Sequence, residues 1–324
     1  MNPIVDREKA LLELERRISE LRAANTDQQL DMSGEISALQ ARYEQILREV
    51  FSSLTPWEKV HMARHPGRPT SLEYIAALDS FDELHGDRHF RDDQAVVGGF
   101  ASLRGRAIMV MGQQRGRDTK ENIIRNFGMV MPEGYRKVRR LALLASRLGL
   151  PIVTLVDTKG ADPGIASEEH AQSEAIAQCL VAFTNATVPI VTVVIGEGGS
   201  GGALALAIAD RVLMLEYSTY SVASPEGCAA ILWADASKAD EAAAHLRLTA
   251  EDLLQFGIVD DIVSEPLGGA QRDPVGTVSR VLDAIDAALG TLETKSSQQL
   301  LDARYEKYRR IGAWERETTP AGSG

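Results

Sequence analysis

Two stretches near the beginning of the chain place apolar residues on one face of a helix. Residues 6–23 and 33–54 both repeat apolar side chains every three or four positions among many charges. Two such helices joined by a polar turn predict a helical hairpin. Because neither helix is long enough to be stable alone in water, their apolar stripes must pack on each other or on a partner. The heptad is not sustained, which favours a docking appendage over an independent coiled coil.

The middle of the chain changes to short apolar runs separated by helical segments. Strands are expected at 95–103, 107–112, 151–156 and 189–195. The last two runs are nearly continuous and β-branched, as in strands that are buried on both faces. Helical periodicity fills 134–148 and about 168–185. The alternation of strands and helices predicts an α/β core.

A Pro-rich joint at 63–70 separates the hairpin from this α/β region. Helices are expected to close the chain at about 249–256, 275–289 and 297–310. The sequence therefore predicts an N-terminal helical extension at 1–62, an α/β domain at 63–312 and a disordered tail at 313–324.

Composition narrows the function classes. The 324 residues include 35 Lys and Arg against 46 Asp and Glu, a net charge of −11, which excludes a basic nucleic-acid-binding domain. Cys179 and Cys228 are too few for a disulfide framework or a four-thiolate zinc site, and both are expected to be small buried residues. No apolar run reaches the roughly 20 residues of a membrane span. We expect a cytoplasmic protein that binds neither membrane nor nucleic acid.

A glycine-rich corner carries the first chemical signal. The strand at 189–195 runs into Gly196-Glu-Gly-Gly-Ser-Gly-Gly, and small residues then begin a helix. Backbone N–H groups at such a helix start bind either a phosphate or a developing oxyanion. The corner is no P-loop, and its match to a dinucleotide fingerprint is weak because no unit of this kind opens the chain. A purely structural tight turn remains an alternative.

A second glycine turn, Asp157-Thr-Lys-Gly-Ala-Asp-Pro-Gly, ends the preceding strand. The carboxyl ends of parallel strands lie at the edge of the sheet where α/β proteins bind ligands, so both turns are expected to face one cleft. Asp157 can act there chemically or simply cap the loop. The six histidines are scattered and offer no metal-ligand spacing. A site of backbone N–H groups without a side-chain base fits chemistry in which the substrate or cofactor supplies the base.

Several longer blocks make a family resemblance specific. They are Ala63-Arg-His-Pro-Gly-Arg-Pro, Phe81-Asp-Glu-Leu-His-Gly-Asp-Arg, Arg115-Gly-Arg-Asp-Thr-Lys-Glu, Arg125-Asn-Phe-Gly-Met, Pro132-Glu-Gly-Tyr-Arg-Lys, Val194-Ile-Gly-Glu-Gly-Gly-Ser-Gly-Gly-Ala-Leu-Ala and Tyr217-Ser-Thr-Tyr-Ser-Val-Ala-Ser-Pro-Glu-Gly-Cys-Ala. From about residue 5 to about 312, the chain resembles the alpha subunits of bacterial, biotin-dependent acetyl-coenzyme A carboxylase carboxyltransferases. The resemblance implies a crotonase-like ββα spiral with an N-terminal helical hairpin and C-terminal helices.

The resemblance also implies a reaction. A carboxyl group would pass from N1-carboxybiotin, carried on a separate carrier protein, to the methyl carbon of acetyl-CoA, giving malonyl-CoA for fatty acid synthesis. Biotin would not be attached to this chain, and no metal would bind to it. The implied partners are a beta subunit with a zinc ribbon, the biotin carboxyl carrier protein and biotin carboxylase. The expected assembly is α2β2, active only with the beta subunit.

The family's Gly-Gly pair before Ala-Leu-Ala gives N–H groups to the urea oxygen of biotin. Carried onto this chain, the pair is Gly201 and Gly202, which become the catalytic candidates. N–H donors fixed about 3 Å from that oxygen would stabilise its developing charge. Their neighbours complete the substrate-binding candidates: Gly198, Gly199, Ser200, Ala203, Asp157, Lys159, Gly160, Asp162 and Gly164.

The chain departs from the family pattern in two places. The loop that usually resembles Asp-Thr-Pro-Gly-Ala-Tyr-Pro-Gly has Lys159 and Asp162 in place of the first proline and the aromatic residue. Gln113 stands where the family often has histidine. Neutral drift with a local Lys159–Asp162 ion pair and an altered substrate specificity both fit these changes.

Other functions therefore stay open. A paralogous carboxyltransferase or decarboxylase subunit would use a different acyl acceptor or carboxyl donor. A non-catalytic assembly subunit would need a broken glycine corner, and the corner is intact. A hydratase or isomerase would need a carboxylate, for which Glu226 is the nearest candidate, although Ser224-Pro-Glu-Gly favours a structural turn. A basic cluster either binds CoA phosphates or is a solvated helix face: Arg125, Arg136, Lys137, Arg139 and Arg140.

Overall fold

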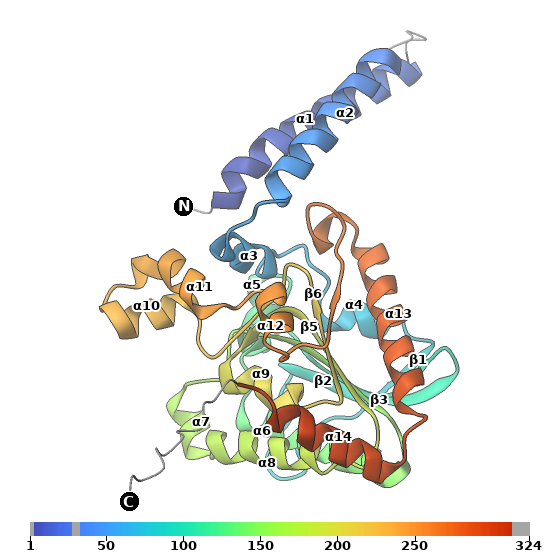
Figure 1. Cartoon of the computed structure of the whole chain (residues 1–324), viewed down its shortest axis with the longest axis vertical. Coiled ribbons are helices and arrows are strands. Elements are labelled where there is room, and N and C mark those ends of the chain that lie inside the picture. Colours follow the sequence, from blue (N-terminus) through green and yellow to red (C-terminus); the bar gives the residue numbers. More distant parts are fainter. Residues whose placement is uncertain (1–2, 28–32, 313–324) are drawn as a thin grey trace, which may run out of the picture.

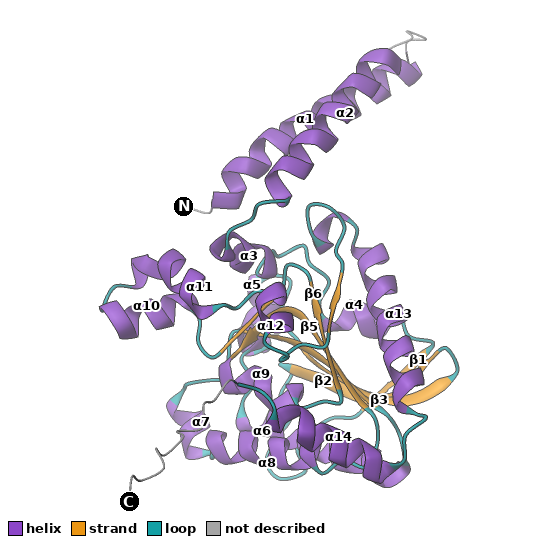
Figure 2. Cartoon of the chain, in the orientation of Figure 1, coloured by secondary structure: helices purple, strands orange, loops and turns teal. Residues whose placement is uncertain are grey.

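A single twisted sheet organises the protein. The computed structural model describes residues 3–27 and 33–312, so the tail predicted at 313–324 lies outside the described residues. The strands are β1 (Ser80–Glu83), β2 (Val96–Leu103), β3 (Arg106–Gln113), β4 (Ile152–Thr158), β5 (Ile190–Gly199), β6 (Arg211–Leu215), β7 (Thr219–Ser221) and β8 (Asp261–Val263). Within the described part of the chain they form one sheet in the order β1-β2-β3-β4-β5-β6-β8, with β7 paired to β5 (Figure 2).

The central strands are parallel, which fixes where a site can form. The β1–β2 and β2–β3 pairs are antiparallel, whereas β3, β4, β5, β6 and β8 run parallel. The β-branched runs of β4 and β5 lie side by side, with Val153 opposite Val191. The carboxyl ends of β3, β4 and β5 therefore meet at one edge of the sheet.

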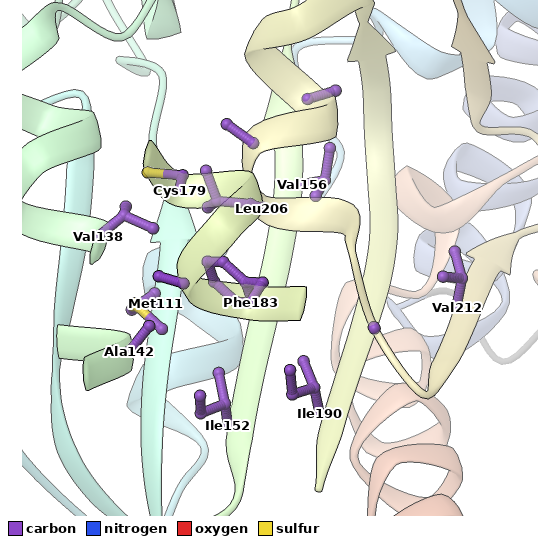
Figure 3. Packing of buried hydrophobic residues seen from close by; sticks show 14 of the residues in the cluster. Met111, Val138, Ala142, Ile152, Val156, Cys179, Phe183, Ile190, Leu206 and Val212 are labelled. Atoms are coloured by element: carbon purple, nitrogen blue, oxygen red, sulfur yellow. The ribbon is translucent and has the colours of Figure 1, made fainter. Parts of the chain in front are cut away.

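Helices cover both faces of the sheet. On one face lie α6 (Pro132–Leu148), α8 (Gln172–Thr184), α9 (Ser200–Ala207) and α12 (Ala250–Gln255). Side chains such as Val138, Phe183 and Leu206 pack there on Ile152 and Ile190 of the sheet (Figure 3). The opposite face is covered by α4 (Ser71–Ala76) and α13 (Pro274–Leu292), and α14 (Ser297–Arg309) adds Leu300 to that cluster. The α/β class expected from the sequence is therefore confirmed.

The N-terminal helices form a hairpin that projects from the body (Figure 1). The helices are α1 (Pro3–Asp27) and α2 (Ser33–Phe51), followed by α3 (Pro56–Ala63). Leu11, Leu47 and Phe51 pack with Met62 of α3 and with Tyr217 of the body. The apolar stripes of the hairpin thus pack on each other and on the base of the domain. The division at residue 62 stays a prediction.

Several elements differ from the sequence expectation. The helix expected at 168–185 is two helices, α7 (Ile165–Glu169) and α8, because Ala171 between them takes a left-handed φ of 62°. The expectation missed five further α-helices: α3, α4, α5 (Thr119–Ile124), α10 (Pro225–Trp233) and α11 (Ala239–Leu246). Cys179 is buried as expected, but Cys228 on α10 is only half-buried, so that expectation is wrong for Cys228. Among the described residues, no helix combines the length and the apolar character that crossing a membrane requires.

Candidate functional site

The glycine corner (residues 196–203) is partly strand and partly helix. Strand β5 does not end at residue 195 but continues to Gly199, because β7 pairs with it from Glu197 to Gly199. Helix α9 then begins at Ser200, whose φ of 53° makes the sharp turn from strand to helix. Gly201 and Gly202 lie in the first turn of α9, where N–H groups have no partner within the helix. The helix start expected after the glycines is confirmed, but the expectation that β5 ends at residue 195 is wrong.

The 157–164 loop lies directly on the glycine corner. A Cβ on Gly199 would sit 2.1 Å from the carbonyl oxygen of Lys159, and one on Gly202 would sit 2.4 Å from the nitrogen of Ala161. Such close approach between backbones requires glycine at both positions. The structure thus brings the two predicted turns together, and it adds Ala161, which sequence reasoning did not single out.

Gly201 differs from Gly202 in its surroundings. A Cβ on Gly201 would meet only the side chain of Ile176, at 3.9 Å. Gly201 and Ser200 also lie in the wall of a cavity of about 420 Å³. The other lining residues are mostly apolar: Leu204, Tyr220, Ser221, Val222, Leu246, Arg247, Leu253, Phe256 and Ile258. Of the predicted site residues, Ser200 and Gly201 face this cavity, whereas Gly202 is buried beneath the loop.

The Asp157 carboxylate is buried and is fully engaged in contacts with the protein. It is buried, and its Oδ2 pairs with Nε of Arg115 at 3.1 Å. Its Oδ1 accepts a hydrogen bond from the N–H of Glu197 at 3.1 Å. Of the two interpretations of Asp157, a structural role is the one that these contacts support. Arg115 was part of a recognised motif, but no sequence signal tied it to this aspartate.

The Lys159–Asp162 ion pair, which one of the two explanations of the altered loop proposed, is not formed. The Asp162 carboxylate accepts hydrogen bonds from Asn126 Nδ2 at 2.9 Å, Ser167 Oγ at 2.6 Å and the N–H of Gly164 at 3.1 Å. Burial alone would raise the pKa of Asp162, but the Ser167 and Asn126 bonds lower it below its usual value. Asp162 thus shapes its own loop, in which Gly160 takes a φ of 151°, and Lys159 is left exposed.

One arginine binds two acidic residues, Glu197 in the glycine corner and Glu226 on α10. Arg64 Nε contacts Glu197 Oε1 at 2.7 Å, and its Nη2 contacts Glu226 Oε2 at 3.2 Å. Ser224 caps α10 through the N–H of Gly227, so the segment around Glu226 is a helix start. This supports the structural interpretation of Glu226 over a catalytic one. Gly198 packs against the Tyr220 ring, where a Cβ would sit 2.7 Å from a ring carbon.

One buried group beside the corner has no partner. The Tyr135 hydroxyl lies 2.9 Å from the position that a Gly202 Cβ would take, and no hydrogen-bond partner reaches it within the described part of the chain. Burial raises the pKa of Tyr135 well above its usual value, so the group stays neutral. The sequence gave no sign of this residue beyond its place in a family motif.

The basic cluster holds a neighbouring loop in place instead of facing solvent. Lys137 is buried, and its Nζ contacts Asp92 Oδ1 at 2.6 Å and the carbonyl oxygen of Val96 at 2.7 Å. Arg140 donates to the carbonyl oxygens of His85 and Gly86. Most of the cluster is thus engaged with the 85–96 segment. The solvated-face interpretation is wrong for Lys137.

Asp87, in the 85–96 segment, is expected to make the stability of the fold depend on pH. Burial would raise its pKa, but N–H donors from Phe90 and His89, together with Arg136, lower it from 3.8 to about 2. A carboxyl with a lowered folded-state pKa stabilises the fold above pH 3.8 and loses that contribution as pH falls toward 2. We expect Asp87→Asn to lower the free energy of unfolding by about 2 kcal/mol near neutral pH. Urea unfolding from pH 6 downward should show the parent and the variant converging; a constant difference would contradict this.

Comparisons with known proteins identify the family of the chain. Residues 4–312 match the family model described as acetyl co-enzyme A carboxylase carboxyltransferase-like. The chain is 50% identical over 317 residues, covering 98% of both chains, to the acetyl-coenzyme A carboxylase carboxyl transferase subunit alpha of Burkholderia mallei. The identity to the subunit of the same name from Staphylococcus aureus is 49% over 312 residues, covering 96% of this chain and 99% of that one. In the described part of the chain, no group of three or more His, Cys, Asp or Glu side chains is placed to hold a metal ion.

Solved structures share the fold. A transcarboxylase 12S structure with methylmalonyl-coenzyme A and methylmalonic acid bound superimposes with a TM-score of 0.55 at 22% identity, over 77% of this chain and 42% of that one. A Pseudomonas malonate decarboxylase hetero-tetramer in complex with coenzyme A gives a TM-score of 0.55 at 18% identity, over 68% of this chain and 87% of that one. The expected crotonase-like architecture is therefore confirmed.

Proposed function

Because this chain belongs to the family of acetyl-coenzyme A carboxylase carboxyl transferase alpha subunits, we propose that its glycine corner takes the biotin side of the carboxyl transfer. The observation that carries the proposal is the open face of Gly201, at the start of α9, beside the apolar cavity of about 420 Å³. A helix start supplies unpaired N–H donors and a positive dipole end. An apolar wall suits a small fused ring system.

The residues present fit a carboxybiotin ring. Most of the cavity wall is apolar, as at Leu204, Val222 and Phe256, and the α9 start at Ser200 and Gly201 adds polar groups to it, together with Ser221 and Arg247. Carboxybiotin, when bound, supplies the carboxyl group, and its ureido oxygen gains negative charge as that group leaves. The N–H groups of Gly201 and Gly202 are the donors that would stabilise this charge. Such a preorganised donor contributes roughly 3 to 4 kcal/mol to a transition state.

The other predicted site residues have supporting roles in this proposal. Gly199, Gly202 and Gly160 allow the loop and the corner to lie in backbone contact. Asp157 and Asp162 hold the loop through buried and half-buried hydrogen bonds. Lys159, which is exposed and next to Gly199, is the residue left free to contact a substrate or a partner. Because Lys159 stands where the family has a proline, carboxyl transfer is to be measured with several acyl-CoA acceptors.

The proposed partners are a beta-type subunit with a zinc ribbon, a biotin carboxyl carrier protein and biotin carboxylase, in a cytoplasmic α2β2 carboxyltransferase that acts on acetyl-CoA. The malonate decarboxylase relatives are a hetero-dimer and a hetero-tetramer, which supports a paired arrangement for this fold. The glycine corner supplies donors for the biotin side alone, so the acyl-CoA side needs a second chain.

We expect the isolated chain to be inactive and the co-purified pair with a beta-type partner to form malonyl-CoA from carboxybiotin and acetyl-CoA. The measurement is carboxyl transfer by each chain alone and by the pair, repeated with several acyl-CoA acceptors. Transfer by the isolated chain would overturn the need for a partner. Preference of the pair for another acceptor would replace acetyl-CoA in the proposal.

A further inference from the structure

The side chain of Gln113 joins the two halves of the candidate site. Gln113 is the last residue of β3 and is fully buried. Its Nε2 donates to the carbonyl oxygen of Gly202 at 2.8 Å. Its Oε1 accepts from the N–H of Asp157 at 3.2 Å. One amide thus links the end of β4 to the first turn of α9.

We propose that Gln113 is a positioning residue for carboxyl transfer, fixing the first turn of α9 against the 157–164 loop. The inference rests on the proposed function of the glycine corner. A carbonyl and the following N–H share one rigid plane, so a bond to the Gly202 oxygen also fixes the direction of the Ala203 N–H. The N–H array of Gly201 and Gly202 belongs to the same turn and moves with it.

A neutral amide is the side chain that suits this position at every pH. The Gly202 oxygen needs a donor and the Asp157 N–H needs an acceptor, and an amide supplies both without titrating. A glutamate can supply both only when protonated, whereas a histidine can supply both only when neutral. Burial keeps water from replacing a lost partner. The charged or titratable groups nearby are the same in every variant: Asp157 with Arg115 and Arg68, Glu197, and the Tyr135 hydroxyl beside Gly202.

Opposite pH profiles test the proposal in the assembled carboxyltransferase. We expect Gln113→Glu to lower kcat by about ten- to a hundredfold at pH 8 and to recover as pH falls. We expect Gln113→His to behave in the reverse way, retaining more activity at high pH than at low pH. The KM for acetyl-CoA should stay unchanged in both, because neither substitution touches the acyl-CoA side. Measurements are restricted to pH values at which thermal unfolding shows each variant fully folded.

Amide hydrogen exchange gives a readout that does not depend on activity. In the parent complex, the Asp157 amide is expected to exchange only when the whole domain opens, and in Gln113→Leu it should exchange much faster while the central β4 amides stay protected. Rapid exchange of this amide in the parent would overturn the contact, even if every variant failed to fold.

The remaining outcomes separate the two claims. Variants that transfer within about threefold of the parent, or that lose activity with the same pH profile as the parent, would overturn the role of Gln113 alone. A folded parent complex without any carboxyl transfer would overturn the proposed function instead.

Discussion

Carboxyl transfer by the assembled enzyme is expected to fall by about 100- to 1,000-fold when Gly202 is replaced by valine. A Cβ at this position would lie 2.4 Å from the nitrogen of Ala161 and 2.6 Å from the carbonyl carbon of Gly160. Both contacts are to backbone, which cannot rotate away as a side chain can. The loop must therefore move off the glycine corner, and the N–H donors lose their fixed positions. Overpacking of this kind costs about 1 to 3 kcal/mol of stability, which should leave the complex assembled.

Gly201→Ala is the matched control, one residue away in the same helix turn. Its Cβ would meet only the Ile176 side chain at 3.9 Å, an ordinary van der Waals distance. We expect this variant to have the same melting temperature as the parent. Any loss of carboxyl transfer would then come from the added methyl group in the cavity wall, because the 157–164 loop has not moved. Turnover, acetyl-CoA affinity and size-exclusion profiles are compared for both variants. If an assembled Gly202→Val enzyme turns over within a few-fold of the parent, the proposal that the glycine corner takes part in carboxyl transfer is wrong.

The central strands and the glycine corner were predictable because their signals are local. The β-branched runs of β4 and β5 identify buried strands, and a glycine cluster before small residues identifies the start of α9. The length of β5 was not predictable. Its last residues pair with β7, which lies about twenty positions further along the chain. Glycines have no side chains whose alternation could indicate a strand. The pairing with β7 therefore determines where β5 ends.

Polar residues that act as internal supports were harder to identify from the sequence. Lys137 and Arg136 lie on a helix with a regular polar pattern, which is typical of a solvated face. The 85–96 segment folds over that face, and its carbonyl and carboxylate oxygens bind these cations. Gln113 shows the same limit, because a glutamine at a strand end gives no sign of the two backbone groups that it meets. Such contacts depend on chain segments that are distant in sequence.

Replacing Arg68 is expected to have the largest effect on the stability of the protein. Arg68 and Glu265 have fully buried side chains and form a bidentate pair, with both N–O distances at 2.7 Å. Arg68 also donates to the carbonyl oxygen of Ile195, just before the glycine corner, at 3.1 Å. Arg68→Leu would leave the Glu265 carboxylate buried without its cation. Removing one partner of a buried ion pair costs about 3 to 5 kcal/mol, so the melting temperature should fall by about 10 °C.

A second substitution tests whether the uncompensated charge is the cause. Glu265 also accepts from the N–H groups of Tyr217 at 2.9 Å and Ala270 at 2.7 Å. Glu265→Gln added to Arg68→Leu removes the buried charge and keeps one acceptor, so part of the lost stability should return. Arg48→Leu is the control, because its pair with Glu44 is 68% and 61% exposed and is worth less than about 1 kcal/mol. Urea unfolding of all four proteins decides the matter. If Arg68→Leu costs no more than Arg48→Leu, the buried pair does not hold this end of β5, and the glycine corner must be supported by its loop contacts alone.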